Sequence, residues 1–301
     1  MLASQGSLLT VSPQTLPGSK LVGTSCSAGS NLGTRTVHIV EQLIAERAPK
    51  LVGRPRLWRA VRPLLYRLLA YDAAVFLANA IRPLTGHEAF RMVARHISPR
   101  TAVEGLSHLP RSGPCIIVAN HPTGLADGLA VHQAIRERRP DHIFLANADA
   151  LRVIPKGDDI IIPVEWVLDK RTVSKTRETL IAMRRAIRAG QCIVIFPSGR
   201  LARAGWSGIL REQPWESSAA MVARKYKVPV VPLRVQARNS ALFYFFHRVN
   251  AELRDITLFR EMLNKKHRLF RLTFGEAVAP EDLPENADEA TQMLRERVLR
   301  L

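Results

Sequence analysis

Apolar and polar positions follow two different periods along most of the chain. Short apolar runs of strand length occupy residues 115–119, 142–146, 160–164, 192–196, 228–235 and 269–274. Between them, stretches with helical periodicity predict helices over 126–138, 171–189, 215–226 and 287–300. Alternation of strands and helices is typical of an α/β fold. We therefore predict a largely parallel central sheet that is flanked by helices.

A purely helical pattern precedes this part of the chain. It predicts helices near 37–47, 57–82 and 86–97, and Pro63 should start or kink a helix there. Residues 1–36 are rich in Ser and Gly and contain no acidic residue, so we predict that they are disordered. The expected organisation is a disordered segment (1–36), a basic amphipathic helical region (37–100) that forms an N-terminal subdomain, and an α/β domain (101–301).

Composition adds one unusual property, a formal net charge of +18 from 44 basic and 26 acidic residues. Such an excess predicts an anionic partner: phospholipid headgroups, nucleic acid or a phosphorylated substrate. The segment 54–81 interleaves arginines with Trp58 and several leucines, which suits a membrane interface. The same pattern also fits a helix that packs on the main domain and exposes a basic face. No uncharged apolar run reaches about 18 residues, so we expect no conventional transmembrane helix.

The first candidate site is the stretch "ANHPTGLADGLA" (119–130), directly after a predicted buried strand. His121 lies at the carboxyl end of that strand, where α/β sheets bind ligands. Asp127 falls in the first turn of the next helix, and the Pro and Gly between them let the loop fold back. A carboxylate on one imidazole nitrogen would fix the tautomer and leave the other nitrogen as a general base. A capping aspartate beside an incidental histidine is the alternative.

The second candidate site is "FPSGR" (196–200), which follows another predicted strand. A tight turn through Ser198 and Gly199 would present backbone N–H groups together with Arg200, and Arg203 is a second cation nearby. Exposed N–H groups with a guanidinium form a phosphate cradle. A surface arginine after a β-turn is the alternative. A serine hydrolase is disfavoured because the G-x-S-x-G elbow lacks its first glycine.

A metal site is not predicted. Several other ligand-type residues invite such an interpretation with His121, namely His132, Asp141, His142 and Asp149. His132 belongs to a separate helix face and no H-E-x-x-H pattern occurs, so we interpret the group as a chance scatter.

Taken together, these motifs resemble those of the glycerolipid (lysophospholipid) acyltransferase superfamily, which includes 1-acylglycerol-3-phosphate acyltransferases. "NHPTGLADG" resembles the His-Asp motif, in the NHPxGxxDG form of a bacterial hemolysin-like subgroup with five instead of four residues between His and Asp. "IVIFPSGRLAR" (193–203) resembles the FPEGTR block, with Ser198 in the place of the usual Glu. "VPVVPLRV" (228–235) resembles the late Val-Pro block, and 150–166 occupies the place of the second block.

The resemblance implies an O-acyltransferase of membrane lipid biosynthesis that moves a fatty acyl chain from acyl-CoA or acyl carrier protein to a lysolipid hydroxyl. It assigns His121 as general base and Asp127 as its partner, and needs neither cofactor nor metal. The substrate-binding residues that it implies are Asn120, Ser198, Gly199, Arg200 and Arg203. We expect a peripheral, monotopic protein at an anionic membrane surface, on the cytoplasmic face of the inner or plasma membrane.

Two other functions stay open at this point. A superfamily member that binds lipid or acyl chains without turnover fits the altered spacing and Ser198. A basic nucleic-acid-binding module fits the charge, but no helix-turn-helix, RNP or zinc signature is present, so nucleic acid is not the expected partner.

Overall fold

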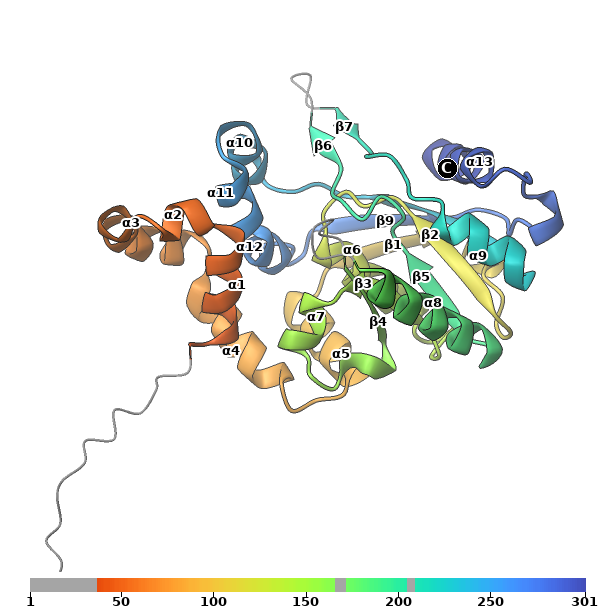
Figure 1. Ribbon diagram of the computed structural model, residues 1–301, viewed down its shortest axis with the longest axis horizontal. Coiled ribbons are helices and arrows are strands. Elements are labelled where there is room, and N and C mark those ends of the chain that lie inside the picture. Colours follow the sequence, from red (N-terminus) through yellow and green to blue (C-terminus); the bar gives the residue numbers. More distant parts are fainter. Residues whose placement is uncertain (1–36, 166–171, 205–208) are drawn as a thin grey trace, which may run out of the picture. The chain divides into compact units, whose positions relative to one another are not determined.

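A seven-stranded sheet forms the centre of the protein (Figure 1). The computed structural model describes residues 37–165, 172–204 and 209–301, so the prediction of disorder for 1–36 lies outside the described residues. The strands are β1 (Arg100–Glu104), β2 (Cys115–Ala119), β3 (Ile143–Asn147), β4 (Ile161–Val164), β5 (Cys192–Ile195), β8 (Val230–Gln236) and β9 (Leu269–Phe274). Their order across the sheet is β1-β9-β8-β2-β5-β3-β4.

The centre of the sheet is parallel, as the sequence predicts. β2 pairs in parallel with β8 and β5, β3 pairs in parallel with β5 and β4, and β1 pairs in parallel with β9. Among the described strands of this sheet, only the β8–β9 pair is antiparallel. All five residues of β2 are buried. A strand covered on both faces reads as one continuous apolar run, which is why this strand was visible in the sequence.

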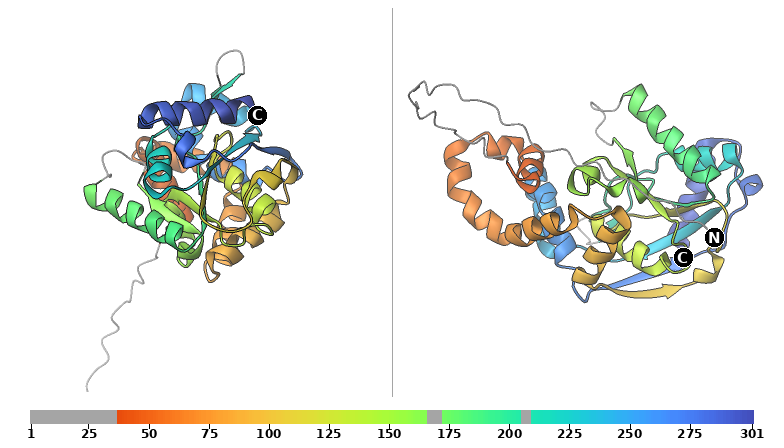
Figure 2. Two further views of the ribbon diagram at one scale, coloured as in Figure 1. Left: turned by 90° about the vertical axis from the view of Figure 1, so that its right-hand side faces the viewer. Right: turned by 90° about the horizontal axis from the view of Figure 1, so that it is seen from below.

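Helices cover both faces of the sheet (Figure 2). Successive side chains of β2 point to opposite faces. Ile116 packs in the same cluster as Met183 of α8 (Val173–Arg188) and Leu294 of α13 (Ala287–Arg300), together with residues of α9 (Ser218–Tyr226). Its neighbour Ile117 belongs to the opposite cluster, which contains Ala130 of α6 (Leu125–Ile135). The expected α/β class with flanking helices is confirmed.

The N-terminal helices pack against helices from the C-terminal half. They are α1 (Ile39–Arg47), α2 (Pro49–Val52), α3 (Pro55–Leu68), α4 (Tyr71–Ile81) and α5 (Gly86–Ile97). The partners are α11 (Ala251–Ile256) and α12 (Leu258–Leu263), which follow α10 (Ala241–Val249) in the chain. Of these, α11 contributes Leu253 and Ile256 to the cluster around Val40 and Ile44. Figure 1 shows these orange and blue helices side by side.

Shorter elements complete the described chain. α7 (Asp149–Val153) follows β3, and a two-stranded antiparallel ribbon is made by β6 (Arg203–Ala204) and β7 (Leu210–Arg211). Single 3₁₀ turns span Leu106–His108, Gly157–Asp159 and Pro280–Asp282.

The prediction of one helix over 57–82 is wrong. The chain breaks between α3 and α4, where Ala70 has φ 53°, and the two helices are bent by 68°. Pro63 lies inside α3 and does not start it; its exposed position lets water bind the backbone carbonyl that the proline leaves free. Among the described helices, none alone has the length and hydropathy to cross a bilayer, although the bent pair α3 and α4 together passes by length and composition.

Candidate active site

His121 is the second residue beyond β2, at the carboxyl edge of the sheet. The preceding Asn120 is buried and uses its side-chain amide on the neighbouring strand: Nδ2 donates to the Val235 carbonyl (2.8 Å) and Oδ1 accepts from the Val235 N–H (2.7 Å). These bonds attach the end of β2 to β8. Asn120 therefore positions the start of the loop, while the substrate contact implied for it stays a prediction.

Asp127 is fully buried in the first turn of α6. Its Oδ2 accepts hydrogen bonds from the backbone N–H groups of Thr123 (2.8 Å) and Gly124 (3.0 Å), and its Oδ1 accepts one from the Thr123 hydroxyl. Gly124 has φ 90°, a conformation that favours glycine. The aspartate is therefore a helix cap, held in one orientation by three donors.

The same carboxylate also reaches the imidazole. His121 Nδ1 lies 3.0 Å from Asp127 Oδ2, and the histidine side chain is 18% exposed whereas that of Asp127 is inaccessible. The imidazole stacks on the Phe196 ring, with ring centroids 4.3 Å apart. Asp127 thus both caps α6 and pairs with His121. A fixed carboxylate on Nδ1 leaves Nε2 as the nitrogen that can exchange a proton with a substrate.

The "FPSGR" turn lies beside this pair because β5 is the direct neighbour of β2. The Ala202 N–H donates to the His121 carbonyl (2.9 Å). Leu201 packs against Gly124, where an added Cβ would lie 3.2 Å from Leu201 Cδ2. The structure therefore brings the two candidate loops together, as expected for adjacent parallel strands.

The four residues predicted in this turn have different environments. Ser198 is buried and its hydroxyl donates to the Arg200 carbonyl (2.9 Å). Gly199 has φ 56° and its N–H closes the turn on the Phe196 carbonyl (2.9 Å), so this N–H group is used within the turn. The side chains of Arg200 and Arg203 are exposed, and Arg203 pairs with Arg211 in the β6–β7 ribbon.

Comparison with known proteins identifies this arrangement. Residues 100–236, which contain both loops, match the acyltransferase family model. This part of the chain is an acyltransferase-family domain. The resemblance to the glycerolipid acyltransferase superfamily is confirmed at this level.

Two lyso-glycine lipid O-acyltransferases are similar in sequence. The one from Phocaeicola vulgatus is 24% identical over 188 residues, or 60% of this chain and 65% of the relative, so the match spans slightly less than two thirds of that protein. The one from Bacteroides thetaiotaomicron is 21% identical over 245 residues, or 79% of this chain and 87% of the relative. The crystal structure of the 1-acyl-sn-glycerophosphate acyltransferase PlsC from Thermotoga maritima is 17% identical, with a TM-score of 0.46, over 86% of this chain and 93% of that chain.

A large cavity of about 910 Å³ opens beside the His-Asp pair of the acyltransferase domain. Asn120 and Pro122, the two neighbours of His121, line it. Its wall is strongly basic, with contributions from the end of β8, the start of β9 and α12: Arg234, Arg238, Arg260, Lys265 and Arg268. Arg200 and Arg203 do not line this cavity. A basic cavity at the reactive edge suits an anionic group of a substrate.

One wall of the cavity is a buried polar network. Lys265 is 2% exposed, and its Nζ contacts Glu261 Oε2 (3.1 Å), Asn239 Oδ1 (2.9 Å) and Asn264 Oδ1 (3.0 Å). Burial lowers the pKa of Lys265, opposed by the Glu261 carboxylate. Because Glu261 compensates Lys265, the arginines supply the excess positive charge of the cavity.

Sequence reasoning missed Glu212. This glutamate follows β7, lines the cavity, and accepts hydrogen bonds from the His121 N–H (3.2 Å) and from Trp215 Nε1 (3.4 Å). Burial raises the pKa of the Glu212 carboxyl, and the neighbouring Ser198 side chain opposes this shift. Glu212 thus joins both loops of the acyltransferase domain from a third segment. No local motif marks it, since its contacts depend on how the chain returns after the β6–β7 ribbon.

The set considered around His121 is not one cluster, but two of its members, His132 and His142, do lie together. These two histidines lie together with His87, on α5, while His121 is separate from them. No local pattern marks this group, because its three members come from three separate segments of the chain. Asp149 instead pairs with Arg47 (3.0 Å), and Asp141 pairs with Arg139 (2.7 Å).

Proposed function

We propose that this protein is an O-acyltransferase that moves a fatty acyl group from a thioester donor, acyl-CoA or acyl carrier protein, to a lysolipid hydroxyl. The observation that carries the proposal is the 3.0 Å contact between His121 Nδ1 and the buried Asp127 carboxylate beside a basic cavity. The acyltransferase-family match over these residues supports it.

In this mechanism, His121 Nε2 takes the proton of the acceptor hydroxyl as its oxygen attacks the thioester carbonyl. The new C–O bond forms, the C–S bond breaks, and the proton passes from the imidazolium to the departing thiolate. A thiol with a pKa of about 8.5 is a good leaving group, so strong acid assistance is unnecessary. Asp127 stabilises the imidazolium and fixes its orientation.

The acceptor in this proposal is a lysolipid with an anionic headgroup. The similar relatives are named for a lyso-glycine lipid acceptor, and the sequence motifs also resemble those of enzymes that use lysophosphatidic acid. The arginine-rich cavity supports an anionic headgroup in either case. Acyl-CoA and acyl carrier protein are both anionic, so the same cavity also fits a donor group.

The decisive experiment is a matrix of lysolipids, including lyso-glycine lipid and lysophosphatidic acid, against labelled acyl-CoA and acyl-acyl carrier protein, with products identified by mass spectrometry. We expect an ester product from at least one pair. Binding of lysolipids without any ester product would favour the non-catalytic alternative.

Two arginines, Arg200 and Arg234, are candidates for the contact with the headgroup, and alanine variants of the two distinguish between them. Loss of a charge-assisted hydrogen bond weakens binding about 10- to 150-fold. If Arg200 contacts the headgroup, Arg200→Ala should raise KM for an anionic lysolipid more than it lowers kcat, because the contact lies far from the reacting hydroxyl. Arg200→Lys should restore only part of the lost affinity, because lysine keeps the positive charge but lacks the bidentate guanidinium.

Arg234 is the matched comparison, because it lines the cavity whereas Arg200 does not. Kinetics of Arg234→Ala and Arg200→Ala should be measured on one anionic and one uncharged lysolipid at fixed donor. The variant that loses affinity only for the anionic lysolipid identifies the headgroup contact. Equal losses on both lysolipids would contradict a headgroup role for that arginine.

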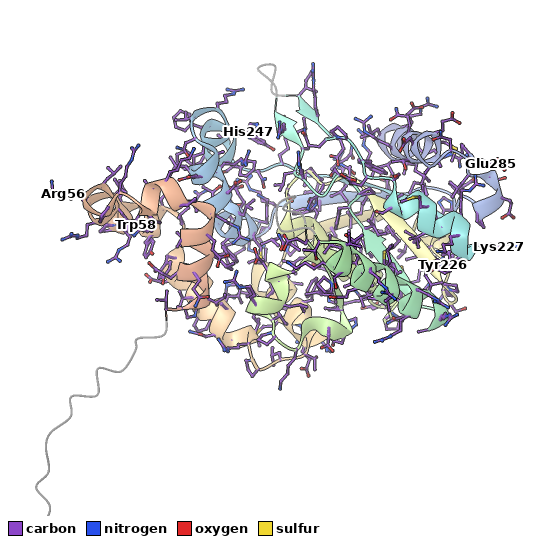
Figure 3. All side chains as sticks on the ribbon, in the orientation of Figure 1. Arg56, Trp58, Tyr226, Lys227, His247 and Glu285 are labelled. Carbon is purple, nitrogen blue, oxygen red and sulfur yellow. The ribbon has the colours of Figure 1, made fainter. Side chains whose placement is uncertain are left out.

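We further propose peripheral binding to anionic membranes, on the cytoplasmic face of the inner or plasma membrane, through α3. None of the residues of α3 is buried, and Leu57 and Leu64 are 42% and 71% exposed. The arginines of this segment, Arg54, Arg56, Arg59, Arg62 and Arg67, are all exposed. Figure 3 labels two side chains of α3, Arg56 and Trp58. Exposed leucines among arginines are typical of an interfacial helix.

Vesicle flotation tests this proposal with the full chain. Each cation at an anionic surface contributes about 1 kcal/mol, so the triple variant Arg56→Gln, Arg59→Gln and Arg67→Gln should bind far more weakly, and salt should weaken native binding. The control carries three equivalent changes on exposed α8 arginines, Arg177, Arg184 and Arg188. Equal loss in both triple variants, or preferential binding of the native protein to DNA, would contradict docking by α3.

A further inference from the structure

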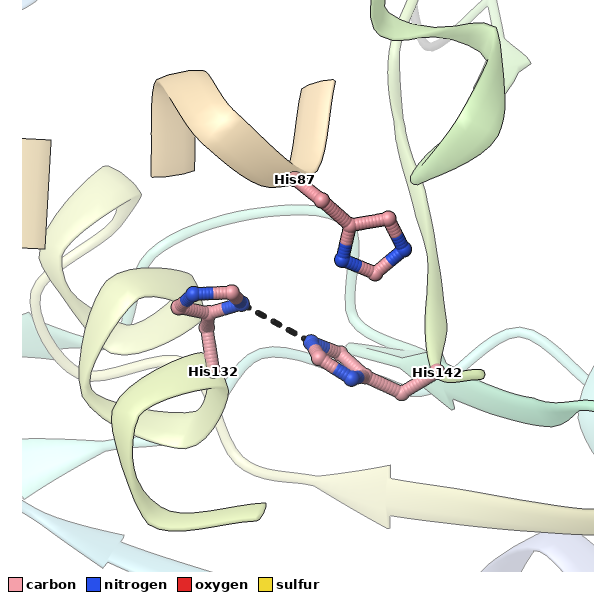
Figure 4. Close-up of side chains that lie close together, drawn as sticks. All are labelled: His87, His132 and His142. Atoms are coloured by element: carbon pink, nitrogen blue, oxygen red, sulfur yellow. Dashed lines mark hydrogen bonds between the residues drawn. The ribbon is translucent and has the colours of Figure 1, made fainter. Parts of the chain in front are cut away.

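Three histidine rings converge on one point at a distance from the His-Asp pair. His87 lies in the first turn of α5, His132 lies in the last turn of α6, and His142 directly precedes β3. One ring nitrogen from each lies within 4.8 Å of the other two. Figure 4 shows the rings facing one another across a small gap. His142 is at the amino end of its strand, whereas His121 is at the carboxyl end of β2, so the cluster occupies the opposite edge of the sheet.

We propose that His87, His132 and His142 form a binding site for a divalent transition-metal ion such as Zn²⁺. Imidazole nitrogens suit Zn²⁺, Cu²⁺ and Ni²⁺. Zinc sites with three protein ligands and water in the fourth coordination position are well known. His87 is only half-buried, so solvent can reach the site and supply the fourth ligand.

The hydrogen bonds around the rings fit this role. His142 Nδ1 lies 2.6 Å from the Arg139 carbonyl, which makes Nδ1 the protonated nitrogen and leaves the Nε2 lone pair toward His132. A carbonyl that orients the second nitrogen is the usual support for a metal-binding histidine. His142 Nε2 is 2.9 Å from His132 Nδ1. Two nitrogens on one tetrahedral zinc ion are about 3.3 Å apart, given Zn–N bonds of about 2.0–2.1 Å. A metal ion would therefore replace the proton between them with a small outward shift of the rings.

The surroundings are poorly suited to histidines that only fill space. Phe90 and Phe144 pack on the rings, at 5.6 Å from His132 and 5.5 Å from His142. His132 is 2% exposed, and its Nε2 has no hydrogen-bond partner among the described residues. A buried polar nitrogen without a partner is destabilising, and an apolar side chain would avoid that penalty. A metal ion bound at His132 Nδ1 leaves this Nε2 unpaired, so only the convergence of the three ring nitrogens favours a ligand over packing.

The protonation state and the nearby charges decide whether a cation is accepted. Burial lowers the pKa of His132 to about 3 and that of His142 to about 4, so both rings are neutral at pH 7 and offer lone pairs. The positive charges of Arg136 and Arg91 lower the pKa of His132 and oppose the binding of a cation there. Two carboxylates add negative charge near the site. Asp141 raises the pKa of His142, and Asp159 Oδ2 accepts a hydrogen bond from the backbone N–H of His87 (3.2 Å).

Such a site would join α5, α6 and the start of β3. Because it lies at the edge of the sheet away from His121, we assign it a stabilising role and no part in acyl transfer. The expected consequence of metal binding is a higher melting temperature, since a ligand that binds only the folded state stabilises it.

The test is a Zn²⁺ titration of the full-length, chelator-treated protein in competition with a chromophoric chelator, in a Cys26→Ser background that removes the one cysteine outside the described residues. We expect one equivalent of Zn²⁺ per chain and a rise in Tm. His87→Ala and His132→Ala should weaken binding by about 100-fold or more. The control His96→Ala changes an exposed histidine of the same helix α5 and should bind normally.

Substitution with Co²⁺ gives a second measurement, because nitrogen-ligated four-coordinate cobalt absorbs visible light. The native protein and His96→Ala should show this absorption and His87→Ala should not. His87→Ala is the main variant because a half-buried ring is easier to remove without unfolding than His132. Absence of stoichiometric Zn²⁺ binding, or equal affinity in His87→Ala and His96→Ala, would overturn the proposal.

Discussion

The His121→Ala variant is expected to transfer acyl groups about 10²–10⁴-fold more slowly than the native protein, because general-base catalysis typically contributes this factor. The loss should appear in kcat, with little change in KM, since the imidazole acts on the reacting hydroxyl and does not carry the headgroup. His121 is packed against Phe196 but still 18% exposed, so its removal should leave Tm nearly unchanged. His96→Ala, an exposed histidine, is the control for the substitution itself.

Asp127→Asn should reduce kcat less than His121→Ala, because the imidazole remains present but loses the charge that stabilises its protonated form. Its effect on stability should be larger, since the Asp127 carboxylate also accepts hydrogen bonds from Thr123 and Gly124. Rates and melting temperatures of both variants should be compared in the same assay. Native turnover by a folded His121→Ala protein would reject the catalytic assignment.

Replacement of Arg139 by methionine should lower the free energy of unfolding by about 3–5 kcal/mol, the range found when one member of a buried charged network is removed. Arg139 has no accessible surface. Its guanidinium donates to the carbonyls of Pro110 (3.2 Å), Gly113 (2.8 Å) and Gly190 (3.0 Å) and pairs with Asp141. Methionine fills much of the volume but leaves these acceptors without a donor.

Arg136→Met is the matched control, three residues earlier in the chain. Arg136 is half-buried and its ion pair with Glu137 spans 3.7 Å, so its loss should change stability by no more than about 0.5 kcal/mol. Urea unfolding of both variants measures the difference. Equal stabilities would show that the three carbonyls find other donors or water when Arg139 is absent.

The fold was predictable where burial determines residue type. β2 and β5 are fully buried, so each reads as a continuous apolar run. Strand β1, "RTAVE", has exposed ends and no fully buried residue, and a strand of this kind leaves no such signal. The break between α3 and α4 was missed because its left-handed residue is Ala70, and alanine by itself favours helix.

The candidate site was predictable only where its residues are close in sequence. His121 and Asp127 belong to one loop and one helix cap, so their spacing suggested a contact that the structure contains. Glu212 reaches His121 from a distant segment, and His87 reaches His132 from another helix. Contacts of this kind follow from tertiary packing and leave no periodic or spacing signal in one sequence.

The two members of the His-Asp pair are located by different parts of the fold, and this has a consequence for how the motif can vary. Asn120 supplies to Val235 the donor and acceptor that another peptide group would supply, so the hydrogen-bond ladder of the sheet effectively extends to the residue before His121. Asp127 is fixed by the start of α6. The connecting residues therefore only bridge two anchored points. A loop of this kind tolerates an inserted residue without separating the pair, which explains how five residues between His121 and Asp127 give a 3.0 Å contact where four are usual in the superfamily.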